Sequence, residues 1–507
     1  MQRLTVDLLV VGGGIHGAGI ARDAAGRGLR VLLAEQGDLA GATSSASSKL
    51  AHGGLRYLEL GDFRLVREAL QERETLMRIA PHLVHPLPFF VPCGPGTRPR
   101  WQLRAGLLLY DWLSARGNLP RSRALDLSRA PDGTLLQAQY RRGFCYYDGW
   151  ADDARLVVAN ALDAAARGAM VMTHAQCVRA TPRGEAWLAE VAMADGSTRM
   201  FAARALVNAT GPWVAQFLHE CTPVRTRARA RLIQGSHLVV QRRSLGGRAL
   251  LLQNDDRRVV FVLPFGPEHA LIGTTDVPLA GDPGNAAISQ AEVDYLCRAA
   301  SRYLADPILP KDVVRTLTGV RTLHDDGEEN PSRVTRDYML QLDFSDGRAP
   351  ILSIFGGKLT TYRRLAEEAL ARLSFLFPAM GPAWTAEAPL PGGDLGGAAD
   401  IGSYVERLRA RHPRLPTEWV TGIARRHGSL AEQIVGSAQR PEDLGTHFGA
   451  DLTAREVGYL YRREWARDPE DVLWRRTKAG LHLSDVQREA LARHLRGLQA
   501  EPSPSAT

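Results

Sequence analysis

The chain contains few lysines, few cysteines and no long apolar run. Its lysines are Lys49, Lys311, Lys358 and Lys478, so the basic side of its formal net charge of +8 is almost entirely arginine. These arginines are scattered along the chain instead of forming one basic segment, which argues against nucleic-acid binding. With 45% hydrophobic and 23% charged residues, the composition is typical of an ordinary folded protein.

The cysteines exclude a further set of functions. The five are widely spaced and form no CxxC pair, so neither a structural zinc site nor a disulfide framework is expected, and a reducing compartment is favoured. No DxDxDG-type loop followed by a glutamate occurs, and we predict no metal site. No window approaches the roughly 18 consecutive apolar residues that a bilayer span needs. We therefore predict a protein of the cytoplasm or of a membrane surface.

The first motif lies almost at the N-terminus, in "VVGGGIHGAGIARDAAGRG". Residues 8–11 are wholly apolar, as in a buried strand of a parallel sheet, and residues 15–27 have helical composition. Between them Gly12, Gly14 and Gly17 form a GxGxxG pattern. The first glycine permits a tight turn, the second lets a pyrophosphate approach the backbone, and the third lets helix and strand pack closely. A diphosphate would then lie at the helix N-terminus.

A second apolar run strengthens this prediction. Residues 31–34 are apolar and Glu35 follows them, near the position where a carboxylate accepts hydrogen bonds from an adenosine ribose. Strand, turn, helix, strand and acid in this register predict a dinucleotide-binding domain. NAD and FAD share the arrangement, so the choice between them depends on other segments.

Three further segments favour FAD. The loop after the second strand is rich in hydroxyls that can bond phosphates or flavin edges and ends in a diglycine, although a polar surface loop is the alternative. The segments "NATGPWV" and "IFGGKLTTYR" each bring small residues to a strand end, and the second begins a helix whose free amides suit the negative charge of a reduced flavin. The residues concerned are Thr43, Ser44, Ser45, Ser48, Gly53, Gly54, Ala209, Thr210, Gly211, Gly356 and Gly357.

The chain resembles the FAD-dependent glycerol-3-phosphate dehydrogenase family over nearly its whole length, through "SSASSKLAHGGLRYLE", "RLVREALQERE", "NATGPWV", "GVRTL", "TRDYML", "IFGGKLTTYR" and "EDVLWRRTKAGL". The resemblance implies an α/β fold, in which a Rossmann-like FAD-binding domain interleaves with a mixed-sheet substrate lobe, as in amino-acid-oxidase-like flavoproteins. A C-terminal all-α cap domain would follow.

The resemblance also implies an activity. The family oxidises sn-glycerol 3-phosphate to dihydroxyacetone phosphate by hydride transfer to flavin N5, and the electrons pass to a membrane quinone. An oxygen-using glycerol-3-phosphate oxidase and a non-catalytic flavin-binding membrane scaffold are the alternatives.

Individual residues receive roles in the same way. His237 corresponds to the family histidine near the alcohol carbon and would accept the alcohol proton, with a core histidine as the alternative; Arg321 could share the task. The substrate phosphate would be bound by Arg56, Tyr57, Arg336 and Lys358. The remaining cofactor contacts that the resemblance implies are His52, Val178, Lys358, Leu359 and Thr360.

Residues 98–116, "RPRWQLRAGLLLYDWLSAR", predict an amphipathic helix. Tryptophan and arginine around an aliphatic stripe suit a helix that lies in a bilayer surface, and a core-facing helix is the alternative. Together with a quinone acceptor, this predicts a protein bound peripherally to the inner face of the cytoplasmic membrane. The apolar stripe consists of Trp101, Ala105, Leu108, Leu109, Trp112 and Leu113.

The order of the motifs predicts the domain limits. FAD-binding and substrate-lobe elements interleave over residues 1–380, with the FAD-binding elements at 4–76, 156–235 and 350–372. A linker rich in proline and glycine covers 381–398, a helical domain 399–500 and a disordered tail 501–507. Homodimerisation and partner docking both stay open as roles for the helical domain.

Overall fold

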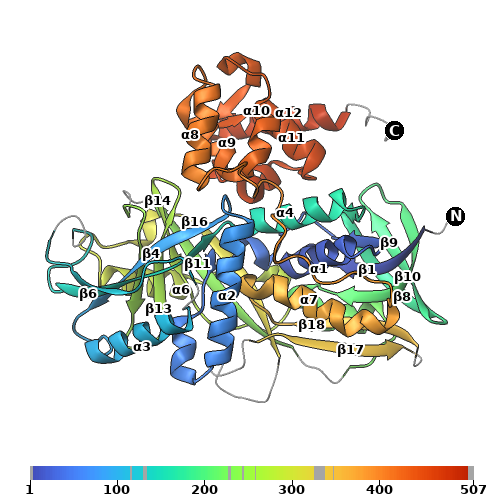
Figure 1. Ribbon diagram of the computed structural model, residues 1–507, viewed down its shortest axis with the longest axis horizontal. Coiled ribbons are helices and arrows are strands. Elements are labelled where there is room, and N and C mark those ends of the chain that lie inside the picture. The colour runs from blue at the N-terminus through green and yellow to red at the C-terminus, as the bar shows by residue number, and fades with distance from the viewer. Residues whose placement is uncertain are drawn as a thin grey trace.

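Two sheets lie side by side, and a helical domain rests over their junction (Figure 1). The computed structural model describes residues 4–114, 117–129, 134–226, 230–241, 245–256, 258–324, 337–345 and 348–500, and only the backbone of Arg56, Leu60 and His324. The predicted tail, 501–507, lies outside this described part. None of the described helices is long and apolar enough to cross a bilayer.

The first sheet holds the dinucleotide-binding motif. Its order is β17-β18-β10-β1-β2-β7, and every pair from β18 to β7 is parallel, while β17 runs antiparallel to β18. A hairpin of β8 and β9 extends from β10. The strands are β1 (Leu4–Val11), β2 (Val31–Ala34), β7 (Met170–Met172), β8 (Ala175–Arg183), β9 (Ala186–Met193), β10 (Thr198–Asn208), β17 (Met339–Ser345) and β18 (Ala349–Phe355).

Helices cover both faces of this sheet, which explains why β2 and β18 are continuous buried apolar runs. On one face α1 (Ile15–Gly26) packs between α4 (Asp153–Ala166) and α7 (Tyr362–Leu373). On the other face α5 (Val214–Cys221) contributes Val214, Phe217 and Leu218 to a separate core. Helix α1 was predicted over residues 15–27, and the observed helix ends one residue earlier.

The second sheet is the substrate lobe. Its order is β15-β11-β14-β13-β12-β4-β6-β3, with β16 paired to β11 and β5 paired to β6. All of its pairs are antiparallel except β12 with β4. The strands are β3 (Leu50–Ala51), β4 (Val84–Cys93), β5 (Arg123–Asp126), β6 (Arg142–Ala151), β11 (Ala230–Gln241), β12 (Ala249–Gln253), β13 (Val259–Phe265), β14 (His269–Gly273), β15 (Val277–Pro278) and β16 (Val313–His324).

The helices of this lobe also lie on both faces. One core contains α6 (Gln290–Ser301), and the opposite core contains α2 (Phe63–Ile79) and α3 (Arg100–Leu113). The α/β fold with two interleaved lobes is thus confirmed.

The predicted limits of the FAD-binding segments are wrong in three places. Residues 50–51 and 230–235 form β3 and part of β11, which belong to the substrate sheet, and β17 joins the first sheet although it lies outside 350–372. Short apolar strands look alike in either sheet, because their side chains are buried in both. Their membership is decided by long-range pairing that the local pattern does not contain.

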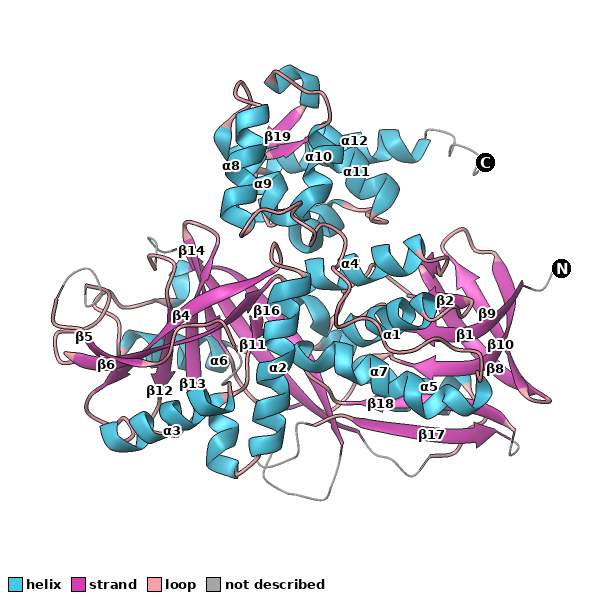
Figure 2. Cartoon of the chain, in the orientation of Figure 1, coloured by secondary structure: helices cyan, strands magenta, loops and turns pink. Residues whose placement is uncertain are grey.

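The C-terminal domain is mainly helical, as predicted, but it also carries a small hairpin of β19 (His447–Gly449) and β20 (Leu452–Thr453) (Figure 2). Two cores hold it together, one around Trp419 and one around Leu460. The helices are α8 (Ile401–Arg411), α9 (Thr417–His427), α10 (Ala431–Val435), α11 (Ala454–Arg463) and α12 (Asp485–Ala500), with a π-helical turn at Asp471–Arg476.

Buried ion pairs attach this domain to the FAD-binding domain. Arg155 on α4 donates to both oxygens of Glu464, with Nη2 2.9 Å from Oε1, and Arg476 donates to both oxygens of Asp38 at 2.6 and 2.7 Å. Lys478 Nζ lies 3.2 Å from Asp152. Buried charges are costly unless they are paired, so these contacts hold the helical domain in one position.

Candidate active site

The glycines of the first motif bring three backbones into contact. Gly12 has φ +109°, and a Cβ there would lie 2.5 Å from the carbonyl oxygen of Ala209 at the end of β10. A Cβ on Gly17 would lie 1.9 Å from the Gly12 oxygen. Helix α1 therefore begins against the ends of β1 and β10, and Gly14 at its N-cap offers no side chain to its amides. This is a backbone cradle of the kind that a cofactor diphosphate fits.

Glu35 is fixed beside this cradle. Its Oε2 accepts the N–H of Gly13 at 2.5 Å, and its Oε1 accepts the N–H of Gly37 at 2.8 Å. Burial raises the pKa of this carboxyl group against the opposing effect of those two hydrogen bonds. The carboxylate is thus held in one orientation, as ribose binding requires.

The hydroxyl loop is tied to the rest of the chain. Ser44 Oγ accepts the N–H of Ile15 at 3.0 Å, which places this hydroxyl at the start of α1 as predicted. Thr43 Oγ1 donates to the carbonyl oxygen of Val320 at 2.8 Å and accepts its N–H, and Ser45 Oγ donates to Ala42. If the Thr43 or Ser45 hydroxyl is to donate to a cofactor phosphate, it must first give up its present acceptor, the carbonyl oxygen of Val320 or of Ala42.

Two small-residue turns lie at the carboxyl ends of the neighbouring parallel strands β10 and β18. Ala209, Thr210 and Gly211 follow β10, and Gly356 and Gly357 follow β18 with φ +76° and +100°. A Cβ on Gly357 would lie 2.6 Å from His16 Cε1, so the second turn touches α1. Carboxyl ends of parallel strands are where α/β folds bind ligands.

The other predicted cofactor contacts surround these turns. Lys358 precedes a 3-10 turn, Leu359–Thr361, and Thr360 Oγ1 accepts the N–H of His52 at 3.2 Å. Gly53 donates to the hydroxyl of buried Tyr110 at 2.9 Å, and Gly54 has φ +78°. Val178 lies farther off, at the bulge between Cys177 and Arg179 in β8, and is 39% exposed. Its strand starts beside Glu35, whose carbonyl oxygen accepts the N–H of Ala175.

His237 lies in the middle of β11 and is buried. Its Nε2 is 2.9 Å from Ser48 Oγ, which brings the predicted base to the hydroxyl loop. A Cβ on Gly273, its partner in β14, would lie 2.1 Å from the imidazole ring, so the glycine makes room for it. Burial, with the charges of Arg321 and Lys49, lowers the pKa of His237 to about 3. The ring is neutral at physiological pH and can accept a proton.

Arg321 on β16 approaches the same place. It pairs with Ile233 of β11, and its Nη2 would lie 2.8 Å from a Cβ on Gly235, which is two residues from His237 on the same face of the strand. The guanidinium forms an ion pair with Asp276, and its Nη2 lies 3.3 Å from Thr274 Oγ1. The two predicted catalytic residues are therefore brought together by one strand pair.

Two of the predicted phosphate ligands also meet. Lys358 Nζ lies 3.8 Å from the centre of the Tyr57 ring, in the 3-10 turn Leu55–Leu60. The backbone of Arg56 is in the same turn, but its side chain is outside the described part of the chain. Arg336 also lies outside the described residues.

Sequence reasoning missed Lys49, Asp153 and Asp276. The Lys49 ammonium is buried, lies 2.6 Å from Asp153 Oδ1 and donates to the carbonyl oxygen of Ser45. It therefore supports the hydroxyl loop from behind while adding positive charge near His237. The sequence offered one signal for Lys49, its position between the serine-rich loop and His52. A lysine buried at such a place is expected to have a paired carboxylate, because buried lysines are rare outside paired sites.

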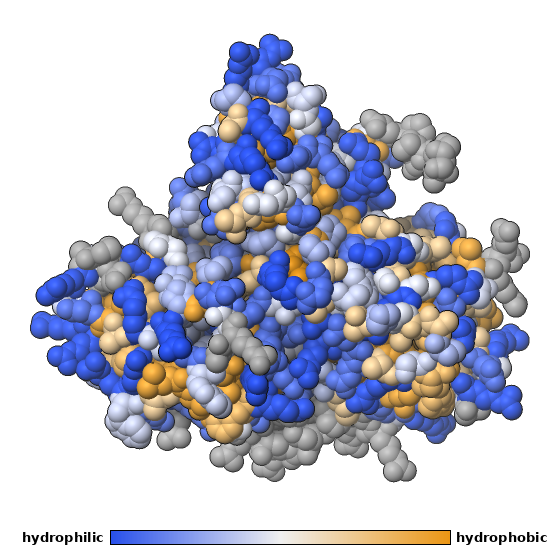
Figure 3. Space-filling view, viewed as in Figure 1, coloured by the Kyte–Doolittle hydropathy of each residue, from blue (hydrophilic) through white to orange (hydrophobic). Residues whose placement is uncertain are grey.

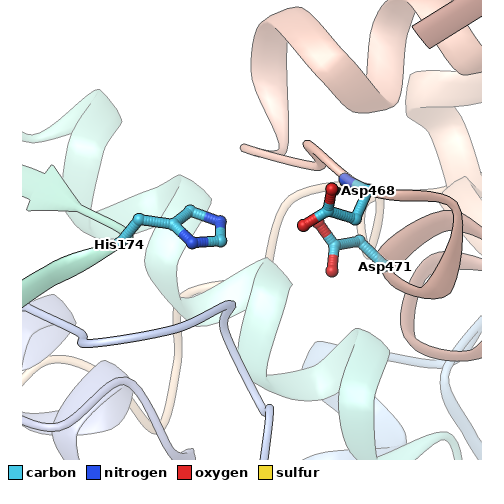
Figure 4. A group of neighbouring side chains, drawn as sticks. All are labelled: His174, Asp468 and Asp471. Atoms are coloured by element: carbon cyan, nitrogen blue, oxygen red, sulfur yellow. Dashed lines mark hydrogen bonds between the residues drawn. The ribbon is translucent and has the colours of Figure 1, made fainter. Parts of the chain in front are cut away.

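One group of side chains has the composition of a metal site. Figure 4 shows His174 facing Asp468 and Asp471 of the helical domain, and their ligand atoms lie within 4.8 Å of one another. Asp471 Oδ2 already accepts the N–H groups of Arg467 and Asp468, and its Oδ1 pairs with Arg475. Since this carboxylate holds its own turn together, we interpret the group as part of the contact between the domains.

Comparison with known proteins gives the family. Residues 7–363 match the model for FAD dependent oxidoreductases, and residues 383–503 match the C-terminal domain of alpha-glycerophosphate oxidase. A glycerol-3-phosphate dehydrogenase of Pseudomonas aeruginosa is 49% identical over 96% of this chain and 94% of its own. This chain belongs to the FAD-dependent glycerol-3-phosphate dehydrogenase family.

Two further relatives extend the comparison. A D-erythritol 1-phosphate dehydrogenase of Brucella abortus is also 49% identical, over 96% of this chain and 97% of its own. Among solved structures, the glycerol-3-phosphate dehydrogenase of Bacillus halodurans complexed with FAD matches with a TM-score of 0.75 at 25% identity, covering 98% of this chain and 94% of that one. FAD is thus the cofactor of this family, and the glycine cradle with Glu35 fits it.

The Glu35 carboxylate yields a prediction. Glu35→Gln removes the charged acceptor that Gly13 and Gly37 hold in place, and hydrogen bonds to charged groups contribute about 1.5–3 kcal/mol. FAD affinity should fall roughly tenfold or more, measured by equilibrium dialysis of the apoprotein with FAD. The matched control is Glu185→Gln in the exposed turn of the β8–β9 hairpin, which should bind FAD like the unaltered chain. Equal affinities for both variants would remove Glu35 from the cofactor site.

Proposed function

We propose that this chain oxidises sn-glycerol 3-phosphate to dihydroxyacetone phosphate and passes the electrons to a membrane quinone. The observation that carries the proposal is the convergence of neutral, buried His237 with Arg321 on one strand pair, next to the loop that borders the FAD cradle. The oxidation removes a hydride from carbon and a proton from oxygen. FAD supplies the acceptor for the hydride when it is bound.

His237 is the proton acceptor in this proposal. Its Nδ1 is enclosed without a hydrogen-bond partner among the described residues, whereas Nε2 faces the Ser48 hydroxyl, so we place the accepted proton at Nε2. An imidazole with a pKa of about 3 is a weak base. Burial is the main cause of this low pKa, and the charge of Arg321 adds to it. A bound phosphate dianion would offset the charge of Arg321 and raise the pKa of His237, which links proton transfer to substrate binding.

The cationic groups bind and orient the phosphate. Arg321 presents a forked donor, and its partner Asp276 must release it or share it when a dianion arrives. Lys358, over the Tyr57 ring, adds a second positive charge on the cofactor side. A site with several cations suits a dianionic phosphate better than the single carboxylate of an amino acid.

D-Erythritol 1-phosphate is the second candidate substrate, because the Brucella abortus relative with that printed activity is as similar to this chain as the Pseudomonas aeruginosa one. Both substrates are polyol monophosphates, so the same base and phosphate ligands serve either. The difference would lie in the space beyond the oxidised carbon.

An anaerobic reduction experiment tests the function. The FAD-loaded protein is mixed separately with sn-glycerol 3-phosphate, D-erythritol 1-phosphate, glycerol and an amino acid, and flavin absorbance at about 450 nm is followed. We expect rapid bleaching with glycerol 3-phosphate and none with glycerol or the amino acid. Faster bleaching with erythritol phosphate would transfer the assignment to that substrate. A flavin that stays oxidised with both phosphates would refute the proposal.

A substitution of the proposed base is the second test. His237→Ala should slow anaerobic flavin reduction by at least roughly tenfold, within the range of about 10²–10⁴ that general base catalysis contributes. Binding of the phosphate substrate should change little, because Arg321 and Lys358 remain. His219→Ala, an exposed histidine on α5, is the control. Reduction at the unaltered rate would show that His237 is a structural residue.

Helix α3 supports membrane attachment. Leu103, Leu107 and Tyr110 are buried against the substrate lobe, but Trp101, Leu108 and Trp112 on the opposite side are 75%, 51% and 69% exposed. Figure 3 shows the resulting hydrophobic patch over α3. Exposed tryptophans beside an aliphatic residue suit the interface of a bilayer, so we place the protein peripherally on the inner face of the cytoplasmic membrane.

Flotation with liposomes tests this attachment. The variant Trp101→Ser, Leu108→Ser, Trp112→Ser loses side chains that are worth about 1.5–3 kcal/mol each when buried, so its partitioning into liposomes should fall by at least about tenfold. Anaerobic flavin reduction should stay normal, since these side chains are exposed. The control is Val486→Ser on α12, which is 78% exposed outside the patch. Unchanged flotation of the triple variant would contradict the proposal.

A further inference from the structure

A cavity of about 440 Å³ lies between the substrate sheet and the helical domain, away from the cofactor cradle. From the sheet it is lined by Gln241, His269 and Arg315, and from the helical domain by Trp474, His482 and Arg488. None of these residues was given a role from the sequence, and none takes part in the function proposed above.

The walls of this cavity present more donors than acceptors. The Arg315 guanidinium lies over Trp474, with Cζ 3.5 Å from the ring centre. Arg315 Nε, Arg488 Nε and His269 Nδ1 are buried and have no hydrogen-bond partner among the described residues. Arg488 is held in place by its Nη2, which donates to the carbonyl oxygen of Gly480 at 2.7 Å. Buried donors without partners are uncommon in folded proteins and indicate a missing acceptor.

The charges around the cavity favour an anion. The acidic groups in reach are Glu268 on the wall and Glu470, which is 63% exposed and lies 3.6 Å from Arg315 Nη2. Neither supplies a buried acceptor. Burial is the main cause that lowers the pKa of Arg315; Glu470 opposes it, and the nearby Arg488 and Arg475 lower the pKa further.

We propose that this cavity binds a small phosphate oxyanion, inorganic phosphate or a phosphate monoester, between Arg315 of the substrate lobe and Arg488 of the helical domain. The anion would accept from guanidinium groups of both domains and thereby bridge them. The site is separate from the active site. Gln241 is four residues from His237 along β11, which corresponds to about 13 Å in a strand.

The same two strands carry both sites. Gln241 and His237 lie on β11, and Arg315 and Arg321 lie on β16, which pairs with β11 in continuous register apart from one shift at Val239/Val240. An anion that fixes Arg315 therefore acts on the strand that positions Arg321. The proposal does not depend on the identity of the oxidised substrate.

Equilibrium dialysis of the FAD-loaded protein against labelled inorganic phosphate tests the site. It measures the total phosphate bound per chain, and a substitution in the cavity should remove only the share that the cavity binds. We expect two equivalents per chain for the unaltered protein and one for Arg488→Gln. The control is Arg496→Gln on the same helix, an exposed arginine paired with Glu489, which should retain two. A parallel titration with glycerol 2-phosphate distinguishes the sources: displacement of the second equivalent identifies a monoester site, and its retention identifies a site for inorganic phosphate.

Two further variants keep the test independent of folding. Arg315→Gln, on the other domain, should also lose one equivalent, while Arg488→Lys should keep it with weaker affinity because the charge remains. Phosphate should change the tryptophan fluorescence of the unaltered protein, and Trp474→Phe should abolish that part of the change. Equal phosphate binding by Arg488→Gln and Arg496→Gln would overturn the proposal.

Discussion

The pairing of β11 with β16 is the constraint on which the rest of the site depends. It is antiparallel from Ala230 to Val240 and places Gly235 opposite Gly319, so that Arg321 can extend over a residue without a side chain toward His237. The same pairing presents the backbone of Val320 to Thr43, which anchors the hydroxyl loop of the cofactor cradle. One ladder of backbone hydrogen bonds thus fixes the candidate base, the candidate anion ligand and one wall of the FAD site.

The charges around His237 couple substrate binding to proton transfer. His237 lies near the positive charges of Arg321 and Lys49, and each of these cations forms an ion pair with a carboxylate, Asp276 and Asp153 respectively. A dianion that competes for Arg321 changes the potential at the imidazole. Substrate binding and readiness to accept a proton are therefore coupled through the same guanidinium, and a neutral polyol would lack that coupling.

The parts of the site that the sequence predicted are those with local signals. The glycine cradle, Glu35 and the turn at Gly356 are each contained in one short segment, where strand, turn and helix follow one another. The polar contacts that complete the site are long-range: 189 residues separate Ser48 from His237, 104 separate Lys49 from Asp153, and 45 separate Asp276 from Arg321. The hydrophobic periodicity of a sequence does not indicate which distant side chains will form such a contact. The same reason explains why β3 and the start of β11 were placed in the wrong sheet.

The parallel sheet has a consequence for the synthesis of the protein. β1 carries the first glycine motif, but its neighbour is β10, and β10 is in turn paired with β18, which ends at Phe355. At translation rates of about 5–20 residues per second, roughly 20–70 s pass between the emergence of the first motif and that of the last turn of the cradle. Until β10 emerges, one edge of β1 lacks its native partner, whereas the other edge can already pair with β2. Cofactor capture is therefore a late event, and the nascent chain is a candidate for chaperone protection.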